Sequence, residues 1–165
     1  MALFRPVRQF HRVTDITPEY LKSIGIKGLA LDADNTLSEH HSQIPLEGVD
    51  EWLERMRTAG IALRMVSNAK DRRCRPFAKK LGLDYISLAC KPLPFGFWRS
   101  RRSMGLKKKE MAAVGDQLFT DMLGAHLGGI TPLLVEPILP EDGWSFRVRR
   151  RLERRLLSRY PRWKP

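Results

Sequence analysis

Short apolar runs alternate with amphipathic stretches along most of this 165-residue chain. The runs are near-continuous and too short for helices, which is typical of strands buried on both faces of a parallel sheet. Between them, apolar residues recur every three or four positions, which predicts helices. Strands are predicted at residues 28–32, 61–67, 85–89, 111–114 and 132–135. Helices are predicted from residue 17, at 45–59, in the stretch that ends at 82, at 95–104 and at 120–127.

The alternation of strands and helices predicts an α/β fold with three layers. A central five-stranded parallel sheet is expected between two layers of helices, in a Rossmann-like arrangement. Residues 1–140 are expected to form this domain, with a short basic N-terminal arm whose first twelve residues hold three arginines and no acid. Pro137 and Pro140 mark a linker, and residues 141–165 are expected to form a basic amphipathic helix or tail.

Polar residues follow four of the predicted strands directly. They are Asp32 and Asp34, Ser67 and Asn68, Lys91, and Asp116, after the first, second, third and fourth strands respectively. The carboxyl ends of parallel strands meet at one edge of a sheet, where ligands of open α/β sheets bind. We therefore expect these side chains to converge on one spot.

A converging set of carboxylates requires a compensating positive charge. Clustered carboxylates repel one another, so a hard divalent cation is their natural partner. A calcium cage is the alternative for an acid cluster alone, but a lysine such as Lys91 has no use in a cage of oxygen ligands. Together with Ser67, the lysine indicates a site for a metal-bound phosphoryl group.

The same residues resemble the four motifs of the haloacid dehalogenase (HAD) phosphohydrolases. DADNTL at 32–37 is similar to the first motif, DxDx[TV], and GDQLFTD at 115–121 is similar to the fourth, GDxxxxD. Ser67 and Lys91 take the places of the second and third motifs. More narrowly, the phrases DITPEYLKSIGIKGLALDADNTL, VSNA, CKPLPFGF and VGDQLFTDMLGAHLGG resemble the YqeG-type subclass IIIA phosphatases, which are related to the mitochondrial phosphatidylglycerophosphate phosphatases.

The resemblance implies a role for each acid. Asp32 is the implied nucleophile, which attacks phosphorus and forms an aspartyl-phosphate, and Asp34 protonates the leaving group and then activates water. Mg²⁺ is the implied cofactor, held by Asp32, the backbone carbonyl of Asp34, and Asp116, with Asp121 acting from behind them. The alternative for Asp121 is an acid that favours the N-terminus of a helix.

The resemblance also implies which residues bind the substrate. Ser67 and Lys91 are expected to bind the phosphoryl oxygens during catalysis, with Asn68 and Thr36 as further substrate-binding residues. Without the motifs, a Ser-Asn pair after a strand reads as a turn and a Lys-Pro pair as a solvated loop. Position after successive strands favours the functional interpretation for both pairs.

Some chemically interesting residues have a simpler interpretation. His40 and His41 are expected to be an exposed surface pair. Cys74 and Cys90 are far apart in sequence, which favours small buried residues in a reducing, cytosolic setting over a disulfide or a nucleophile. For Trp98, packing in the core and contact with substrate or lipid remain equal alternatives.

No sizeable cap domain fits between the motifs. Thirty residues separate Thr36 from Ser67, and 22 separate Asn68 from Lys91. A helix, a strand and short loops account for each interval. The site is therefore expected to be open, which suits phosphates carried by something bulky.

The chain is strongly basic, with a formal net charge of +12. Residues 144–165 hold nine basic residues and a single acid, and apolar residues repeat there at positions 148, 152, 156 and 160. Three interpretations stay open: a helix at an anionic bilayer surface, a helix packed on its own domain, and a helix that binds RNA. The expected location is the cytoplasm, with peripheral contact at the inner membrane surface.

These patterns and the resemblance predict a Mg²⁺-dependent phosphomonoester hydrolase without a cap. Phosphatidylglycerophosphate, a phosphorylated lipid head group, is the substrate that the resemblance implies. One alternative is a soluble phosphomonoester such as a sugar or nucleotide phosphate. The other is a basic nucleic-acid-associated factor in which the phosphatase site is secondary, and the intact set of acids argues against it.

Overall fold

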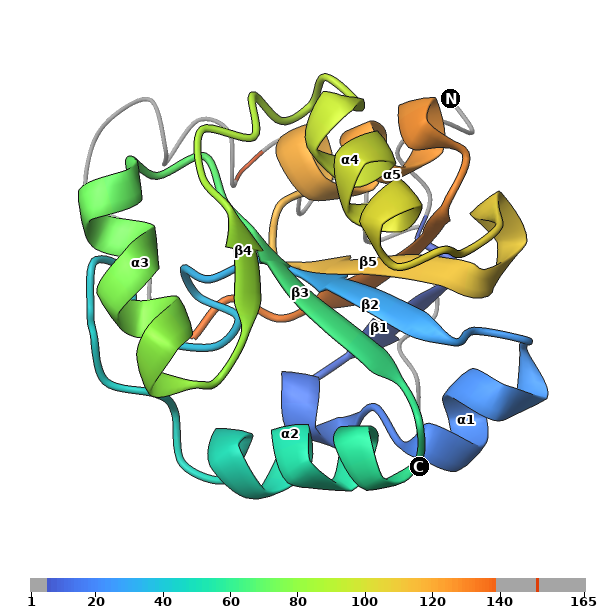
Figure 1. Ribbon diagram of the computed structural model, residues 1–165, viewed down its shortest axis with the longest axis horizontal. Coiled ribbons are helices and arrows are strands. Elements are labelled where there is room, and N and C mark those ends of the chain that lie inside the picture. The colour runs from blue at the N-terminus through green and yellow to red at the C-terminus, as the bar shows by residue number, and fades with distance from the viewer. Residues whose placement is uncertain (1–5, 139–150, 152–165) are drawn as a thin grey trace.

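A computed structural model describes residues 6–138 and Arg151, and shows a parallel sheet with helices on both faces (Figure 1). The strands are β1 (Arg8–Phe10), β2 (Gly28–Leu31), β3 (Ala62–Val66), β4 (Asp84–Ile86), β5 (Met111–Gly115) and β6 (Thr131–Val135). Their order across the sheet is β1-β6-β5-β2-β3-β4, and every pair is parallel. The chain runs from β2 toward one edge and from β5 toward the other, so the order reverses between these two strands. Open α/β sheets bind their ligands at such a reversal.

Helices cover the sheet unevenly, three on one face and two on the other. They are α1 (Pro18–Ser23), α2 (Val49–Thr58), α3 (Asp71–Lys80), α4 (Phe95–Ser103) and α5 (Leu123–Gly128). Short 3₁₀ helices lie at Val13–Asp15 and Lys108–Glu110, and one π-helical turn lies at Leu118–Met122. Leu29 of β2 packs in one core with residues of α1, α2 and α3, whereas its neighbour Ala30 packs with α4 and α5. Successive side chains of a strand point to opposite faces, so a single strand serves both cores.

The structure confirms the three-layer parallel architecture and corrects the number of strands from five to six. The missed strand is β1, in the segment that the sequence analysis treated as a basic arm. Phe10 of β1 is buried, and the strand pairs with β6 in a register that places Arg8 opposite Leu133. The helix predicted from residue 17 is α1, and Thr17 caps it, because its hydroxyl accepts a hydrogen bond from the Tyr20 backbone N–H at 3.1 Å.

The loop between β2 and α2 holds no cap domain. It carries isolated bridges from Ser38 to Asp34 and Pro45, and α2 begins only at Val49, four residues later than residue 45, where the helix was predicted. Gly48 precedes this helix with φ +80°, a conformation that favours glycine. The predicted basic tail at 141–165 lies outside the described residues, apart from Arg151. Among the described helices, none combines the length and apolarity that a membrane span requires.

Candidate active site

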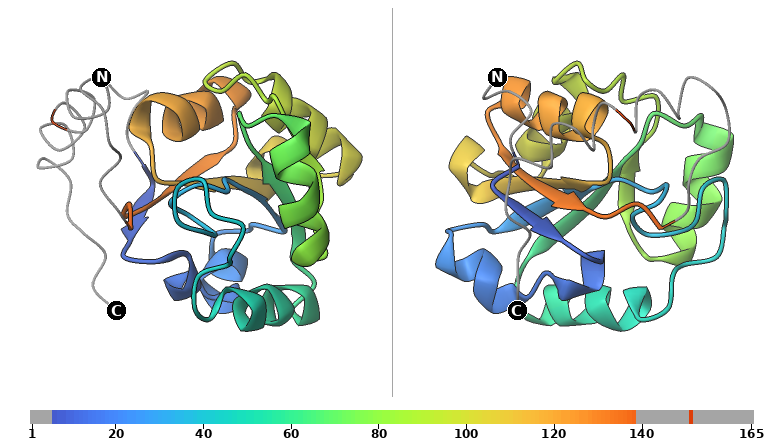
Figure 2. Two further views of the ribbon diagram at one scale, coloured as in Figure 1. Left: turned by 90° about the vertical axis from the view of Figure 1, so that its left-hand side faces the viewer. Right: turned by 180° about the vertical axis from the view of Figure 1, so that it is seen from behind.

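Four strand ends deliver the polar residues to one edge of the sheet. The backbone N–H of Asp32 donates to Val114 of β5 at 2.9 Å, and that of Ser67 donates to Ile86 of β4 at the same distance, so both residues continue the sheet by one step. Figure 2, left, looks onto this edge, with the loop that follows β2 in front of the sheet and α3 beside it. The sheet hydrogen bonds of the backbone therefore place the polar residues close together, as predicted.

The centre of this edge is a buried cluster of three acids and a lysine. Asp32, Asp116 and Asp121 each offer a carboxylate oxygen, and these oxygens lie within 4.8 Å of one another. The Lys91 Nζ donates to Asp32 Oδ1 and to Asp121 Oδ1, both at 2.6 Å. All four residues are buried, so these charge-assisted hydrogen bonds are little screened by water.

Backbone geometry explains how Asp121 reaches the cluster. It lies on the turn Leu118–Met122, and its Oδ2 accepts from the Gln117 backbone N–H at 3.2 Å. Gly115, at the end of β5, makes room for it: a side-chain carbon at position 115 would lie 2.7 Å from Asp121 Cβ and still closer to the carboxylate. Gly115 is therefore needed here for the close approach of Asp121, because its φ is one that other residues also adopt.

The cluster carries more negative than positive charge. Burial raises the pKa of Asp32 to about 7, and neighbouring Asp121 adds to this rise while Lys91 opposes it. Burial alone lowers the pKa of Lys91, but Asp121 and Asp32 outweigh it and raise that pKa above the ordinary lysine value. Three carboxylates against one ammonium group leave a deficit of positive charge, and hard carboxylate oxygens are the ligands that Mg²⁺ prefers. The residues present therefore fit a divalent cation.

Ser67 and Asn68 occupy the turn after β3 and differ in what they contact. The Ser67 Oγ is buried and accepts from the Ala69 backbone N–H at 3.1 Å. The Asn68 side chain bonds to both backbone groups of Lys91: its Nδ2 donates to the carbonyl at 3.0 Å, and its Oδ1 accepts from the N–H at 2.7 Å. Asn68 thus positions the loop that carries the lysine.

Asp34 is held by a cationic partner that sequence reasoning missed. Arg73, in the first turn of α3, donates from Nη1 to Asp34 Oδ2 at 2.9 Å and from Nη2 to Oδ1. The His41 backbone N–H donates to Oδ1 at 2.9 Å, and His40 Nδ1 lies 3.7 Å from the same oxygen. Burial raises the pKa of Asp34, but the hydrogen bonds from Arg73 and His41 outweigh it and hold that pKa below its ordinary value.

His40 and His41 therefore lie closer to the site than the sequence indicated, because both contact the Asp34–Arg73 pair. His41 is exposed as expected, but its backbone is part of the Asp34 contact and its ring nitrogen lies 2.9 Å from Arg73 Nη1. His40 beside it is half-buried, which corrects the expectation that both histidines are exposed. The one available signal for Arg73 was its position six residues after Ser67, at the start of the helix that follows the second motif.

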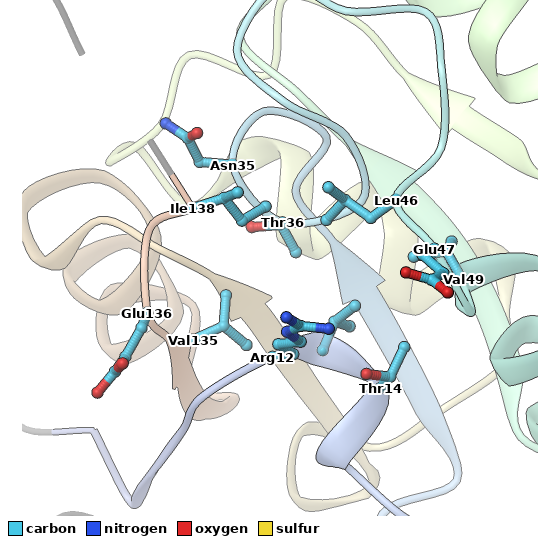
Figure 3. Close-up of a pocket in the computed structure, with 11 residues that line it drawn as sticks. Arg12, Thr14, Asn35, Thr36, Leu46, Glu47, Val49, Val135, Glu136 and Ile138 are labelled. Carbon is cyan, nitrogen blue, oxygen red and sulfur yellow. The ribbon is translucent and has the colours of Figure 1, made fainter. Parts of the chain in front are cut away.

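Two separate cavities adjoin the loop that follows β2. Asp34, Ser67 and Arg73 line a void of about 10 Å³. Thr36 instead lines a cavity of about 210 Å³ on the side of α2 and β6, where Arg12 lies across the hollow from it (Figure 3). The Thr36 hydroxyl is buried and has no hydrogen-bond partner within the described part of the chain. Of the predicted substrate-binding residues, the structure thus groups Ser67, Asn68 and Lys91 and sets Thr36 apart.

The two cysteines behave differently from each other. Cys74 is buried as predicted and lines the small void beside Ser67. Cys90 is exposed, which corrects the expectation of a buried residue, because it lies on the loop between β4 and α4 next to Lys91.

Comparisons with known proteins agree with this geometry. The family model of the haloacid dehalogenase-like hydrolases matches residues 32–129. A probable phosphatase, YqeG, of Bacillus subtilis (strain 168) is 40% identical over 155 residues, covering 94% of this chain and 90% of that protein. Phosphatidylglycerophosphate phosphatase 1, chloroplastic/mitochondrial, of Arabidopsis thaliana is 27% identical, covering 87% of this chain and 44% of that protein.

Solved structures share the fold. The cobalt-bound deoxy-D-mannose-octulosonate 8-phosphate phosphatase of Haemophilus influenzae matches 69% of this chain and 70% of its own, with a TM-score of 0.55 and 13% identity. At that identity the likeness shows the architecture alone.

Proposed function

This chain belongs to the haloacid dehalogenase-like hydrolase family and is a phosphatase of that type, and we propose that it cleaves phosphomonoesters through Asp32 with Mg²⁺ as cofactor. The observation that carries the proposal is the Lys91 Nζ bridging Asp32 and Asp121 inside the buried acid cluster. A lysine in contact with a carboxylate nucleophile favours the ionised form of that carboxylate and offers positive charge to an incoming phosphate.

The proposed metal site uses Asp32, Asp116 and the backbone carbonyl of Asp34, with Asp121 orienting Lys91 from behind. The ion supplies positive charge that offsets the repulsion between the acids and the phosphate. The three side-chain carboxylates of the cluster support this assignment through their mutual proximity and burial.

The chain's own residues supply the rest of the proposed chemistry. An Asp32 carboxylate oxygen bonds to phosphorus while the bond from phosphorus to the leaving oxygen breaks, which gives an aspartyl-phosphate. Ser67 hydrogen-bonds a phosphoryl oxygen, and Lys91 neutralises charge as it develops. Asp34 gives a proton to the leaving oxygen and later takes one from the attacking water. The water oxygen bonds to phosphorus while the bond from phosphorus to the Asp32 oxygen breaks, which releases phosphate and regenerates the Asp32 carboxylate. This role requires Asp34 to leave Arg73, which now holds it as an anion.

We propose phosphatidylglycerophosphate as the substrate. The relative named for that activity supports it, as does the absence of a cap in the loop between β2 and α2. A soluble sugar or nucleotide phosphate is the alternative within the same chemistry. A site without a cap on this loop favours a bulky substrate over a small one, because no cap encloses the leaving group.

The proposal is tested by a substrate panel in Mg²⁺ and in EDTA. Phosphatidylglycerophosphate in vesicles is compared with glycerol phosphate, sugar phosphates, nucleotides and an aryl phosphate. The wild type should release phosphate only with the metal, and Asp32→Asn should fall to the background rate. Asp50→Asn, on the exposed face of α2, is the matched control and should keep full activity. Turnover by the Asp32→Asn protein, or full turnover in EDTA, would refute the mechanism.

A further inference from the structure

The loop between β4 and α4, together with the first residue of α4, exposes three large apolar side chains around the site lysine. Leu88, Leu93 and Phe95 are 59%, 50% and 55% exposed, and we call them the apolar rim. They lie within four residues of Lys91, whose Nζ reaches Asp32 at 2.6 Å. Single exposed apolar residues are ordinary on protein surfaces, but three of them within eight consecutive residues beside an uncapped site are not.

The backbone of this loop holds the rim outward at a cost. Leu88 and Cys90 have φ values of +46° and +56°, which non-glycine residues seldom adopt. Hydrogen bonds to the turn after β3 fix this shape: the Leu88 N–H donates to Ala69 and the Ala89 N–H to Ser67, both at 3.0 Å. The strained conformation gains no burial for Leu88. Its outward direction is therefore a fixed property of the loop, tied to the same turn that carries Ser67.

The stretch of sequence that carries the rim is basic. No acid occurs from residue 85 to residue 109. Arg99 and Arg102 follow Phe95 by one and two helical turns, and both are exposed on α4. Half-buried Trp98 backs the rim, with its ring centroid 5.6 Å from that of Phe95. Apolar and aromatic tips followed by arginines on one helix face are typical of surfaces that lie at an anionic bilayer.

We propose that the apolar rim inserts among the head groups of an anionic lipid bilayer, with Arg99 and Arg102 facing lipid phosphates. A second copy of this chain is a poor occupant, because it would bring the same basic field against itself. A nucleic acid would use the arginines but would leave the two leucines in water. The rim flanks Lys91, so docking there would bring a phosphate at the membrane surface to the loop that contacts Asp32.

Cys90 provides a built-in probe for this contact. It is exposed within the rim loop, whereas Cys74, the other cysteine, is buried, so an environment-sensitive fluorophore should label Cys90 selectively. The labelled full chain is mixed with vesicles of phosphatidylcholine, with or without phosphatidylglycerol. Emission should shift to the blue only with the anionic vesicles. The control is Val7→Cys in a Cys90→Ser background, since Val7 is an equally exposed apolar residue at 60% on the segment before β1, and its label should not shift.

A paired variant checks that the rim contributes affinity. Leu93→Gln/Phe95→Gln should weaken flotation with anionic vesicles by about tenfold, whereas Val7→Gln should not. Hydrolysis of a soluble aryl phosphate reports separately on the catalytic site, so a failed docking proposal and a failed phosphatase proposal give different results. An unshifted Cys90 label on vesicle-bound protein would overturn the proposal, because another surface would then carry the binding. So would a concentration-dependent dimer that Leu93→Gln/Phe95→Gln abolishes, since the occupant would be a second copy.

Discussion

Arg73 and Asp34 form a two-pronged ion pair beside the acid cluster, with Arg73 Nη1 donating to Asp34 Oδ2 at 2.9 Å and Nη2 donating to Oδ1. The pair joins α3 to the loop after β2, and His41 completes it with a backbone N–H. Asp34 is the proposed proton donor, yet this pairing favours its ionised form. A substrate phosphate carries negative charge and would compete with Asp34 for the same guanidinium group.

Arg73→Gln should lower the free energy of unfolding by about 1–3 kcal/mol at pH 7, because it leaves a half-buried carboxylate without its cation. Asp34 has a lowered pKa in the folded state, so the pair stabilises the protein above the unfolded pKa of about 4 and is lost as pH falls through the folded value. Urea denaturation at pH 7 and near pH 3 measures both points. Arg72→Gln is the matched control, since Arg72 is exposed and makes no ion pair within the described residues. Equal losses in the two variants would contradict the role of the pair.

The sequence predicted the residues at the centre of the site but did not predict the ion pair between Arg73 and Asp34. Asp32, Lys91 and Asp116 were predictable because each follows an apolar run, and parallel strands bring their ends to one edge. Arg73 and its partner Asp34 are 39 positions apart in the sequence. Two arginines stand side by side in the first turn of α3, and the sequence does not indicate which of them contacts an acid. Likewise, β1 is a three-residue strand with an exposed arginine, too short to show alternation, and only its pairing with β6 defines it.

Lys91→Met should destabilise the protein by about 3–5 kcal/mol in EDTA, because two buried carboxylates lose the only ammonium group that they contact within residues 6–138. Mg²⁺ should restore part of that loss if the cation occupies the same cluster. Thermal or urea denaturation with and without Mg²⁺ measures the difference. Lys27→Met is the control: Lys27 pairs with Glu110 at 2.7 Å but is 65% exposed, so its removal should cost about 0–1 kcal/mol.

Metal and protons should compete for Asp32. Its pKa is raised to about 7 in the folded protein, so its contribution to stability is complete below the unfolded pKa and is lost as pH rises through the folded value. In EDTA, the Tm should therefore decline between about pH 4 and pH 7. Mg²⁺ requires the ionised carboxylate, so it should raise the Tm more at pH 8 than at pH 5.5. An equal rise at both pH values, or none, would contradict a cation site that includes Asp32.

Gly115→Ala should damage the acid cluster without removing any charged group. The added methyl carbon would lie 2.7 Å from Asp121 Cβ, so Asp121 must move and its 2.6 Å hydrogen bond from Lys91 must lengthen. Groups that orient metal-site residues typically contribute 10–100-fold, so we expect the Mg²⁺ affinity and kcat to fall by about that factor. Mg²⁺ titration of turnover and of the Tm measures both. Gly128→Ala is the matched control, because its new carbon would lie 3.5 Å from Phe97, an ordinary contact, and activity should persist. If Gly115→Ala binds Mg²⁺ normally, Asp121 does not depend on this close approach.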